Sequence, residues 1–379
     1  MQKLINEKEL ERLLERIELK RSYPELVIKL INEIQDKSFM IYEEIRSLYR
    51  MIFRQIDQIR GRIILCEPPE QEICVPIVGV DGSLVLMRGI GRRFLALISV
   101  SQVIFPQGLQ DIENPRVNLS VSMETVEERY DKPPKSQAIL RMMLGESKAI
   151  NILANELANG YIMIDGPIID PPNMLEVTYI EYRAEALSNA IKKGIEVIGV
   201  VKRYRSNILR DKFFKELPPV SDQEIAPILF SIIRKEKTIK PNQALAVRPI
   251  PLSSENEGYS KQIIEAYKDA LKNCGIEDEI YTSYLQVHQG IRPIKVEFFA
   301  KNEKVALHKI QKIIKLFKDT TVVGTNLPLP ILLAHKTCLI RKRVAEVLVK
   351  EVLSRVASFR SQEIDFQVLR DLIYISEGD

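Results

Sequence analysis

Two Asp-Gly steps that follow apolar runs are the first candidates for chemistry in this chain. Asp81 stands in VGVDGS, residues 78–83, and Asp165 stands in YIMIDGPI, residues 161–168. Either step alone is explained by turn formation, which favours Asp and Gly. Two buried strands that each end in a carboxylate indicate more, because neighbouring carboxylates repel each other unless a cation lies between them. Oxygen ligands of this kind suit magnesium or manganese.

A metal held by two aspartates needs further ligands, and the predicted helix before the second strand offers two glutamates. Glu146 and Glu156 both lie in this helix, and either is also explained as a solvated helix charge. Glu146 shares its side of the helix with Leu140, Met143 and Ile150. We therefore expect Glu146, rather than Glu156 near the frayed end, to point inward.

A basic stretch follows the next predicted strand. In GVVKRYRSNILRDKFFK, residues 199–215, the strand ends at Lys202, and basic residues alternate with aromatic ones. The stretch is either a solvated charge run or a phosphate-binding patch with aromatic stacking surfaces. On the second interpretation Lys202 reaches the scissile phosphate, and the nucleic acid is bound by Lys202, Arg203, Tyr204 and Arg205.

One histidine of the three stands in a setting that suggests a role. His335 lies about one turn into a predicted helix that begins at Pro330, in LPLPILLAHK. A single histidine on a helix is more often structural than a metal ligand. We therefore consider His335 a candidate ligand only together with the carboxylates of Asp81 and Asp165.

The elements that must position these residues form an α/β pattern. Residues 1–60 are predicted to be a helical arm, 75–325 a core of strands and helices, and 326–379 a C-terminal helical region. Within the core, antiparallel strands are followed by strand-helix-strand crossovers, which predicts a mixed sheet flanked by helices. Nothing in the sequence marks a flexible linker, so we expect one elaborated domain over residues 1–379.

Composition excludes several classes of protein. The 379 residues are 45% hydrophobic and 28% charged, and their net charge of +4 excludes a generally polycationic nucleic-acid coat. The four cysteines show no spacing typical of zinc binding, which favours reduced thiols. The charged N-terminus and the absence of a long apolar run predict a cytoplasmic protein with no membrane contact.

Taken in order, these motifs resemble the NurA nucleases of archaea and some bacteria. The resemblance rests on VDGS, a helix glutamate followed by IDGP, the GVVK strand, and the PLP…AHK helix, and it extends over residues 78–345. No single one of these motifs is specific; their order is what carries the resemblance. This sequence departs from the family pattern at Asp165-Gly166-Pro167, where many members repeat D-G-S. The position that aligns with the family's helix glutamate is uncertain by about one helical turn.

The resemblance implies a ribonuclease H-like core and a nuclease dependent on Mn²⁺ or Mg²⁺, with two ions expected. It implies cleavage of single-stranded DNA and digestion of DNA ends from the 5′ side, in end resection and recombinational repair. It also implies a homodimer and a partner, the hexameric ATPase HerA. By this resemblance, the metal-binding residues are Asp81, Glu146, Asp165 and His335, and His335 is either a ligand or a proton shuttle. Lys202 matches a conserved basic position of the family.

Two other interpretations remain open. The chain is alternatively a non-catalytic DNA-binding adaptor for a hexameric translocase, although a complete acidic set argues against lost activity. RGIGRR, residues 88–93, is alternatively a phosphate-binding loop, but it lacks a third glycine and no helix pattern follows it, which favours a hairpin turn.

Overall fold

The fold is described from a computed structural model of the chain. The structure describes residues 24–66, 73–89, 92–130, 132–169, 176–252, 261–322 and 324–358. The first part of the predicted N-terminal arm and the last part of the C-terminal region therefore lie outside the described residues, as does the centre of RGIGRR.

One mixed sheet of ten strands organises the described residues. The order across it is β1-β7-β9-β10-β6-β5-β2-β3-β4, and β8 pairs with β9. The pairs β2–β5 and β5–β6 are parallel, and the other pairs are antiparallel. The strands are β1 (Ile63–Cys66), β2 (Ile77–Arg88), β3 (Arg93–Phe105), β4 (Arg116–Glu127), β5 (Gly160–Ile164), β6 (Ile195–Val201), β7 (Ala244–Val247), β8 (Ile250–Pro251), β9 (Glu279–Gln286) and β10 (Ile294–Ala300).

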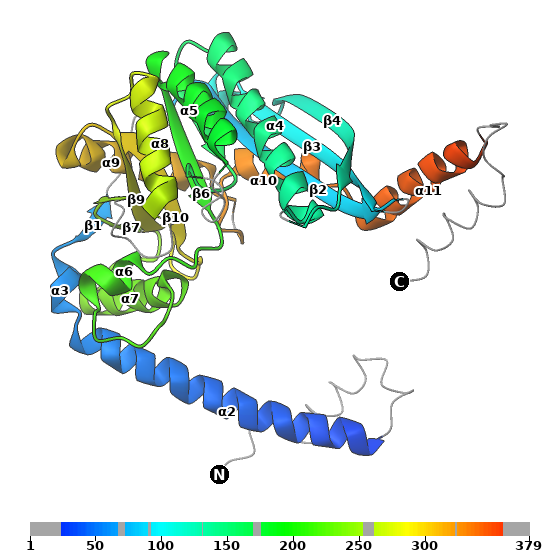
Figure 1. Cartoon of the computed structure of the whole chain (residues 1–379). Coiled ribbons are helices and arrows are strands. Elements are labelled where there is room, and N and C mark those ends of the chain that lie inside the picture. Colours follow the sequence, from blue (N-terminus) through cyan, green and yellow to red (C-terminus); the bar gives the residue numbers. More distant parts are fainter. Residues whose placement is uncertain are drawn as a thin grey trace.

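Helices cover both faces of this sheet, which confirms the predicted fold class. Figure 1 shows α4, α5 and α8 side by side on one face, with α9 and α10 behind the sheet. The described helices are α2 (Pro24–Arg54), α3 (Asp57–Arg60), α4 (Pro134–Glu156), α5 (Val177–Lys192), α6 (Ile208–Phe213), α7 (Asp222–Glu236), α8 (Lys261–Asn273), α9 (Glu303–Thr320), α10 (Leu329–Cys338) and α11 (Lys342–Ser358), with a short 3-10 turn, η2 (Gly108–Asp111).

The side chains of each central strand contribute to two separate hydrophobic cores, one on either face of the sheet. In β2, Val78 and Val80 belong to the core under α4, α5 and α8, whereas Ile77 belongs to the core under α9 and α10. Successive side chains of a strand point to opposite faces, so a strand buried on both faces is apolar at nearly every position. A carboxylate at residue 81 is therefore exceptional, and the alternation places Asp81 on the α10 side.

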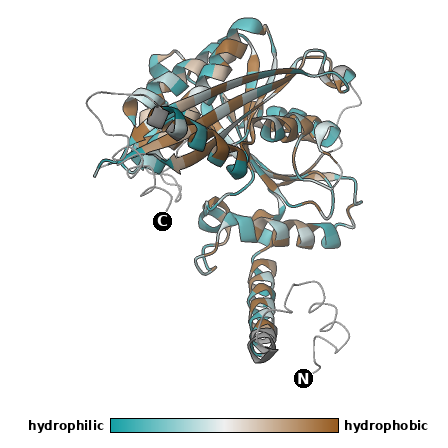
Figure 2. Cartoon of the chain, turned by 90° about the vertical axis from the view of Figure 1, so that its right-hand side faces the viewer, coloured by the Kyte–Doolittle hydropathy of each residue, from teal (hydrophilic) through white to brown (hydrophobic). Residues whose placement is uncertain are grey.

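The long helix α2 extends away from the sheet and contacts the body near α7 (Figures 1 and 2). Its C-terminal part is anchored by the buried Leu48 and Ile52. Large apolar side chains farther along α2 remain exposed, among them Phe39, Ile41 and Ile45. In the described part of the chain, no helix is both long and apolar enough to cross a membrane.

Candidate active site

Asp81 lies inside β2 and not at its end, so the predicted strand boundary was wrong. β2 continues to Arg88 because it pairs with β3 along its whole length. On its other side β2 pairs with β5 only over Ile77–Val80. Asp81 is therefore the first residue of β2 beyond its parallel neighbour, and its side chain is buried.

Asp165 follows β5 directly and lies beside Asp81. The backbone N–H of Asp165 donates to the carbonyl of Val80 at 3.0 Å, which keeps the chain in register for one residue after the strand. At Gly166 the chain turns away with φ of 149°, a conformation that favours glycine. The carboxyl end of a parallel strand thus delivers Asp165 to the side chain of Asp81.

His335 reaches the two aspartates from α10. This helix lies so close to β2 that a Cβ atom on Gly79 would stand 2.2 Å from the carbonyl oxygen of Pro330. Farther along, the hydroxyl of Ser101 donates to the carbonyl of Ala334 at 2.8 Å. These contacts fix both ends of α10 against the sheet, and His335, in its last turn, is half exposed.

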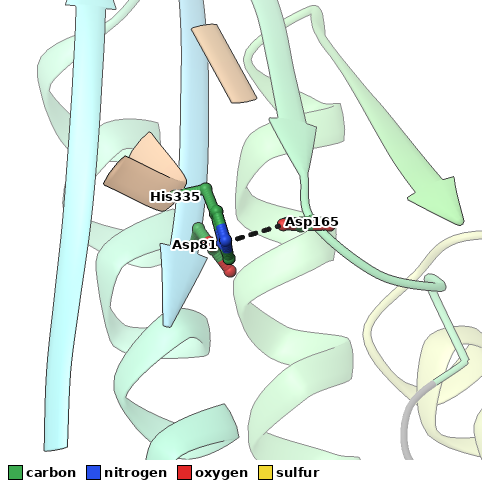
Figure 3. Close-up of side chains that lie close together, drawn as sticks. All are labelled: Asp81, Asp165 and His335. Atoms are coloured by element: carbon green, nitrogen blue, oxygen red, sulfur yellow. Dashed lines mark hydrogen bonds and ion pairs between the residues drawn. The ribbon is translucent and has the colours of Figure 1, made fainter. Parts of the chain in front are cut away.

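The three side chains converge on one point (Figure 3). Nδ1 of His335 lies 2.7 Å from Oδ2 of Asp81 and 3.8 Å from Oδ2 of Asp165. One candidate ligand atom from each residue lies within 4.8 Å of the others. Two carboxylates and an imidazole at this spacing fit a divalent cation with oxygen and nitrogen ligands.

Lys202 stands where it was predicted, at the end of β6. Its ammonium group forms an ion pair with Oδ2 of Asp165 and is partly exposed. Because an ammonium group has only donors, Lys202 cannot bind a metal, but it can neutralise an anion beside Asp165.

The electrostatics of Asp81 show that its charge is incompletely balanced by these groups. Burial, and then the neighbouring carboxylate of Asp165, raise the pKa of the Asp81 carboxyl from 3.8 to about 6. His335 and Lys202 act in the opposite direction and only partly offset this. A bound divalent cation would favour the ionised form of Asp81.

The two candidate glutamates differ sharply in environment. Glu146 is only 3% exposed, and its Oε1 would lie 2.7 Å from a Cβ atom on Gly82. It approaches β2 from the α4 face, opposite to Asp81, and is not among the three residues gathered within 4.8 Å. Glu156 is exposed and pairs with Arg116.

The basic stretch is only partly a surface for nucleic acid. Arg203 and Arg205 are exposed, but Tyr204 is 3% exposed and packs edge-on against Tyr284. Its hydroxyl donates to the carbonyl of Pro293 at 3.2 Å. The prediction that Tyr204 stacks on bases is therefore wrong, because its ring belongs to the core. Phe213, which ends α6, and Phe214, which follows it, are buried as well.

Sequence reasoning missed Cys338, which ends α10. Its Sγ lies 3.5 Å from Oδ2 of Asp81. Burial and the Asp81 carboxylate raise the pKa of this thiol well above its ordinary range, which favours the protonated thiol as a donor to Asp81 in the metal-free site. The one available signal was its position three residues after His335, on the same side of the helix.

A mixed sheet flanked by helices brings together two aspartates from adjacent strands and a histidine, and this set suits the divalent cations that assist phosphodiester hydrolysis. The model of the NurA domain family matches residues 75–338 of this chain. The chain therefore belongs to the NurA family, and the predicted resemblance is confirmed. Among curated protein sequences, none matches the chain significantly.

Solved NurA structures share this fold. The NurA nuclease from Sulfolobus solfataricus is 15% identical with a TM-score of 0.61, and the alignment covers 88% of this chain and 98% of that one. A second NurA structure is 11% identical with a TM-score of 0.55, covering 87% and 98%. A NurA structure with manganese is 10% identical with a TM-score of 0.51, covering 88% and 99%. At these identities the likeness establishes the common fold.

Proposed function

We propose that this nuclease cleaves single-stranded DNA and digests DNA ends from the 5′ side, with Mn²⁺ or Mg²⁺ held by Asp81, Asp165 and His335. The observation that supports this proposal most strongly is that one candidate ligand atom from each of the three residues lies within 4.8 Å of the others. The NurA structure with manganese supports the choice of metal. Two ions are part of the proposal, with Glu146 completing one coordination shell and His335 binding the second ion or transferring a proton.

The residues of the site divide the work. A divalent cation supplies, when bound, activation of water and stabilisation of the leaving oxyanion. Asp81 and Asp165 bind the cation, and the hydrogen bond between Asp81 and His335 orients the imidazole. Lys202 neutralises the negative charge of the scissile phosphate, because its ammonium group already stands beside Asp165.

We further propose that the chain, one elaborated domain, acts in the cytoplasm as a homodimer together with a HerA-type hexameric ATPase, in end resection and recombinational repair. Exposed apolar side chains on the projecting helix α2 support an additional interface, since contiguous apolar surface marks interaction sites. Light scattering of the pure chain at about micromolar concentration, with and without the ATPase, tests both associations. A monomer under both conditions contradicts them.

The activity is tested by incubating the pure protein with labelled single-stranded DNA, with and without Mn²⁺. Cleavage is expected only with the metal, and Asp165→Asn is expected to reduce it at least about 100-fold, because a neutral amide is a weaker cation ligand. Circular dichroism and the melting temperature check that the variant is folded. If the wild-type protein binds DNA but never cleaves it with either metal, the chain is an adaptor rather than a nuclease.

A further inference from the structure

A basic pocket adjoins the candidate active site. It has a volume of about 390 Å³, and its lining includes Lys202, Arg203, Arg292, Gly290 and Asn326. These residues come from three loops: the one after β6, the one between β9 and β10, and the one between α9 and α10. Three of the lining side chains are basic and none is acidic. The pocket therefore favours an anion.

The two arginines are available for a ligand. Arg203 and Arg292 are both exposed, and no carboxylate of the described residues forms a salt bridge with either guanidinium. This distinguishes them from Lys202, which is paired with Asp165. Guanidinium groups bind phosphate oxygens through two parallel hydrogen bonds, so two unpaired arginines in one pocket suit a phosphodiester.

The two loops that carry these arginines are held together by hydrogen bonds. Tyr204 follows Arg203, Pro293 follows Arg292, and the buried hydroxyl of Tyr204 donates to the carbonyl of Pro293. The backbone N–H of Tyr204 donates to Oε1 of Gln223 at 3.1 Å, which ties the same loop to α7. The two loops are thus joined beneath the surface, and less conformational entropy is lost when both arginines contact one strand.

The position of the pocket indicates which anion it receives. Lys202 lines the pocket and contacts Asp165, so the pocket begins at the proposed scissile position. A second cavity of about 520 Å³ lies along the same loop and shares Gly290, Ile291 and Arg292, and Lys235 lines its other side. Arg292 therefore lines both hollows, and Lys202 and Lys235 line them on either side.

We propose that Arg203 and Arg292 form a phosphate-binding subsite for the nucleic-acid strand, next to the scissile phosphate, and that the strand continues past Arg292 toward Lys235. This rests on the proposed nuclease function. The subsite contacts the backbone and not the base edges, so it binds single strands without sequence preference. Arg203 and Arg292 position the strand, while Lys202 acts at the reacting phosphate.

The test measures binding and cleavage separately. Binding of a fluorescent oligothymidylate is followed by anisotropy in EDTA for the wild type, Arg203→Gln, Arg292→Gln and the double variant. Each single substitution is expected to weaken binding on the order of tenfold. Each is also expected to reduce the slope of log affinity against log salt by about 0.7. The matched control is Lys272→Gln, an exposed cation on α8 remote from the pocket, which is expected to bind like the wild type.

A chemical variant of the ligand adds a second readout. One neutral methylphosphonate is moved along the oligonucleotide, and the wild type is expected to lose affinity at the position that meets the subsite. Arg292→Gln is expected to lose no further affinity there, because the contact is already absent. Unchanged affinity and salt slope in the double variant, or an equal loss in Lys272→Gln, overturns the subsite.

Cleavage with Mn²⁺ separates this proposal from the proposed function. The arginine variants are expected to raise KM while the half-maximal Mn²⁺ concentration stays constant. If the wild type cleaves DNA and both variants cleave it with unchanged KM, the subsite is wrong and the nuclease function stands. If no protein cleaves DNA but the binding losses appear, the nuclease function is wrong and the phosphate subsite stands.

Discussion

Nδ1 of His335 lies 2.7 Å from Oδ2 of Asp81, although 254 residues separate the two in sequence. Asp81 belongs to β2 and His335 to α10, and the two elements meet where Gly79 lets the backbone of Pro330 approach. The imidazole is half exposed, whereas the carboxylate is buried. His335 thus lies between the buried carboxylate of Asp81, a proposed metal ligand, and the solvent.

The role of His335 is tested by His335→Ala. If the imidazole binds the cation, the substitution raises the half-maximal Mn²⁺ concentration by about 10- to 100-fold, and excess metal partly restores the rate. If it transfers a proton instead, the metal titration is unchanged and the pH–rate profile loses a limb near neutral pH. His308→Ala, at an exposed position of α9, is the control and is expected to change neither. Unchanged behaviour in both assays removes His335 from the site.

The raised pKa of Asp81 predicts a pH-dependent stability of the metal-free protein. Between its ordinary value of 3.8 and about 6, this carboxyl binds more protons in the folded than in the unfolded state. The free energy of unfolding therefore falls as the pH rises through this interval, and the destabilisation is complete above about pH 6.

Asp81→Asn removes that titration. The variant is expected to be more stable than the wild type above about pH 6, by at most about 3 kcal/mol, with the difference vanishing toward about pH 4. Urea denaturation in EDTA across this range measures it. Asp269→Asn, at an exposed position of α8, serves as the control. A constant stability difference at every pH contradicts the assigned titration.

The two glutamates of α4 are distinguished by matched substitutions. Glu146→Gln is expected to lower cleavage at least about tenfold, because the buried carboxylate lies against Gly82, next to Asp81. Glu156→Gln is expected to leave the rate unchanged and to cost at most about 1 kcal/mol, since it breaks only a surface pair with Arg116. Rates of single-stranded DNA cleavage at saturating Mn²⁺ compare the two. Loss of activity in Glu156→Gln alone reverses the assignment.

The burial of Tyr204 predicts a cost in stability rather than a loss of base stacking. Tyr204→Phe is expected to lower the free energy of unfolding by about 1 kcal/mol, because the hydrogen bond to Pro293 is lost. Tyr204→Ala is expected to lower it by about 3–5 kcal/mol through the cavity that it leaves. Tyr130→Phe, at a fully exposed tyrosine, is the control for thermal and urea denaturation. A stable Tyr204→Ala variant would place the ring outside the core.

Much of the site was predictable because its residues stand in local patterns. Asp165 and Lys202 directly follow short apolar strands, and such strands end where polar residues begin. The inward side of α4 was predictable too, since Glu146 shares it with apolar residues at helical spacing, and it is buried. The mixed sheet with flanking helices followed from the alternation of the same two periodicities.

Local patterns identified the residues that carry charge at the ends and edges of apolar elements, because helix and strand periodicities are properties of short segments. Which of these residues meet depends on contacts between elements far apart in the chain. β2 continues past Asp81 because β3 pairs with it beyond the end of β5, and no local pattern records the length of a neighbouring strand. Tyr204 is buried because β9 and the loop after it cover the segment, although its own neighbours are exposed arginines. Arg292 joins Arg203 for the same reason: side chains far apart in sequence become neighbours only when the sheet brings their loops together.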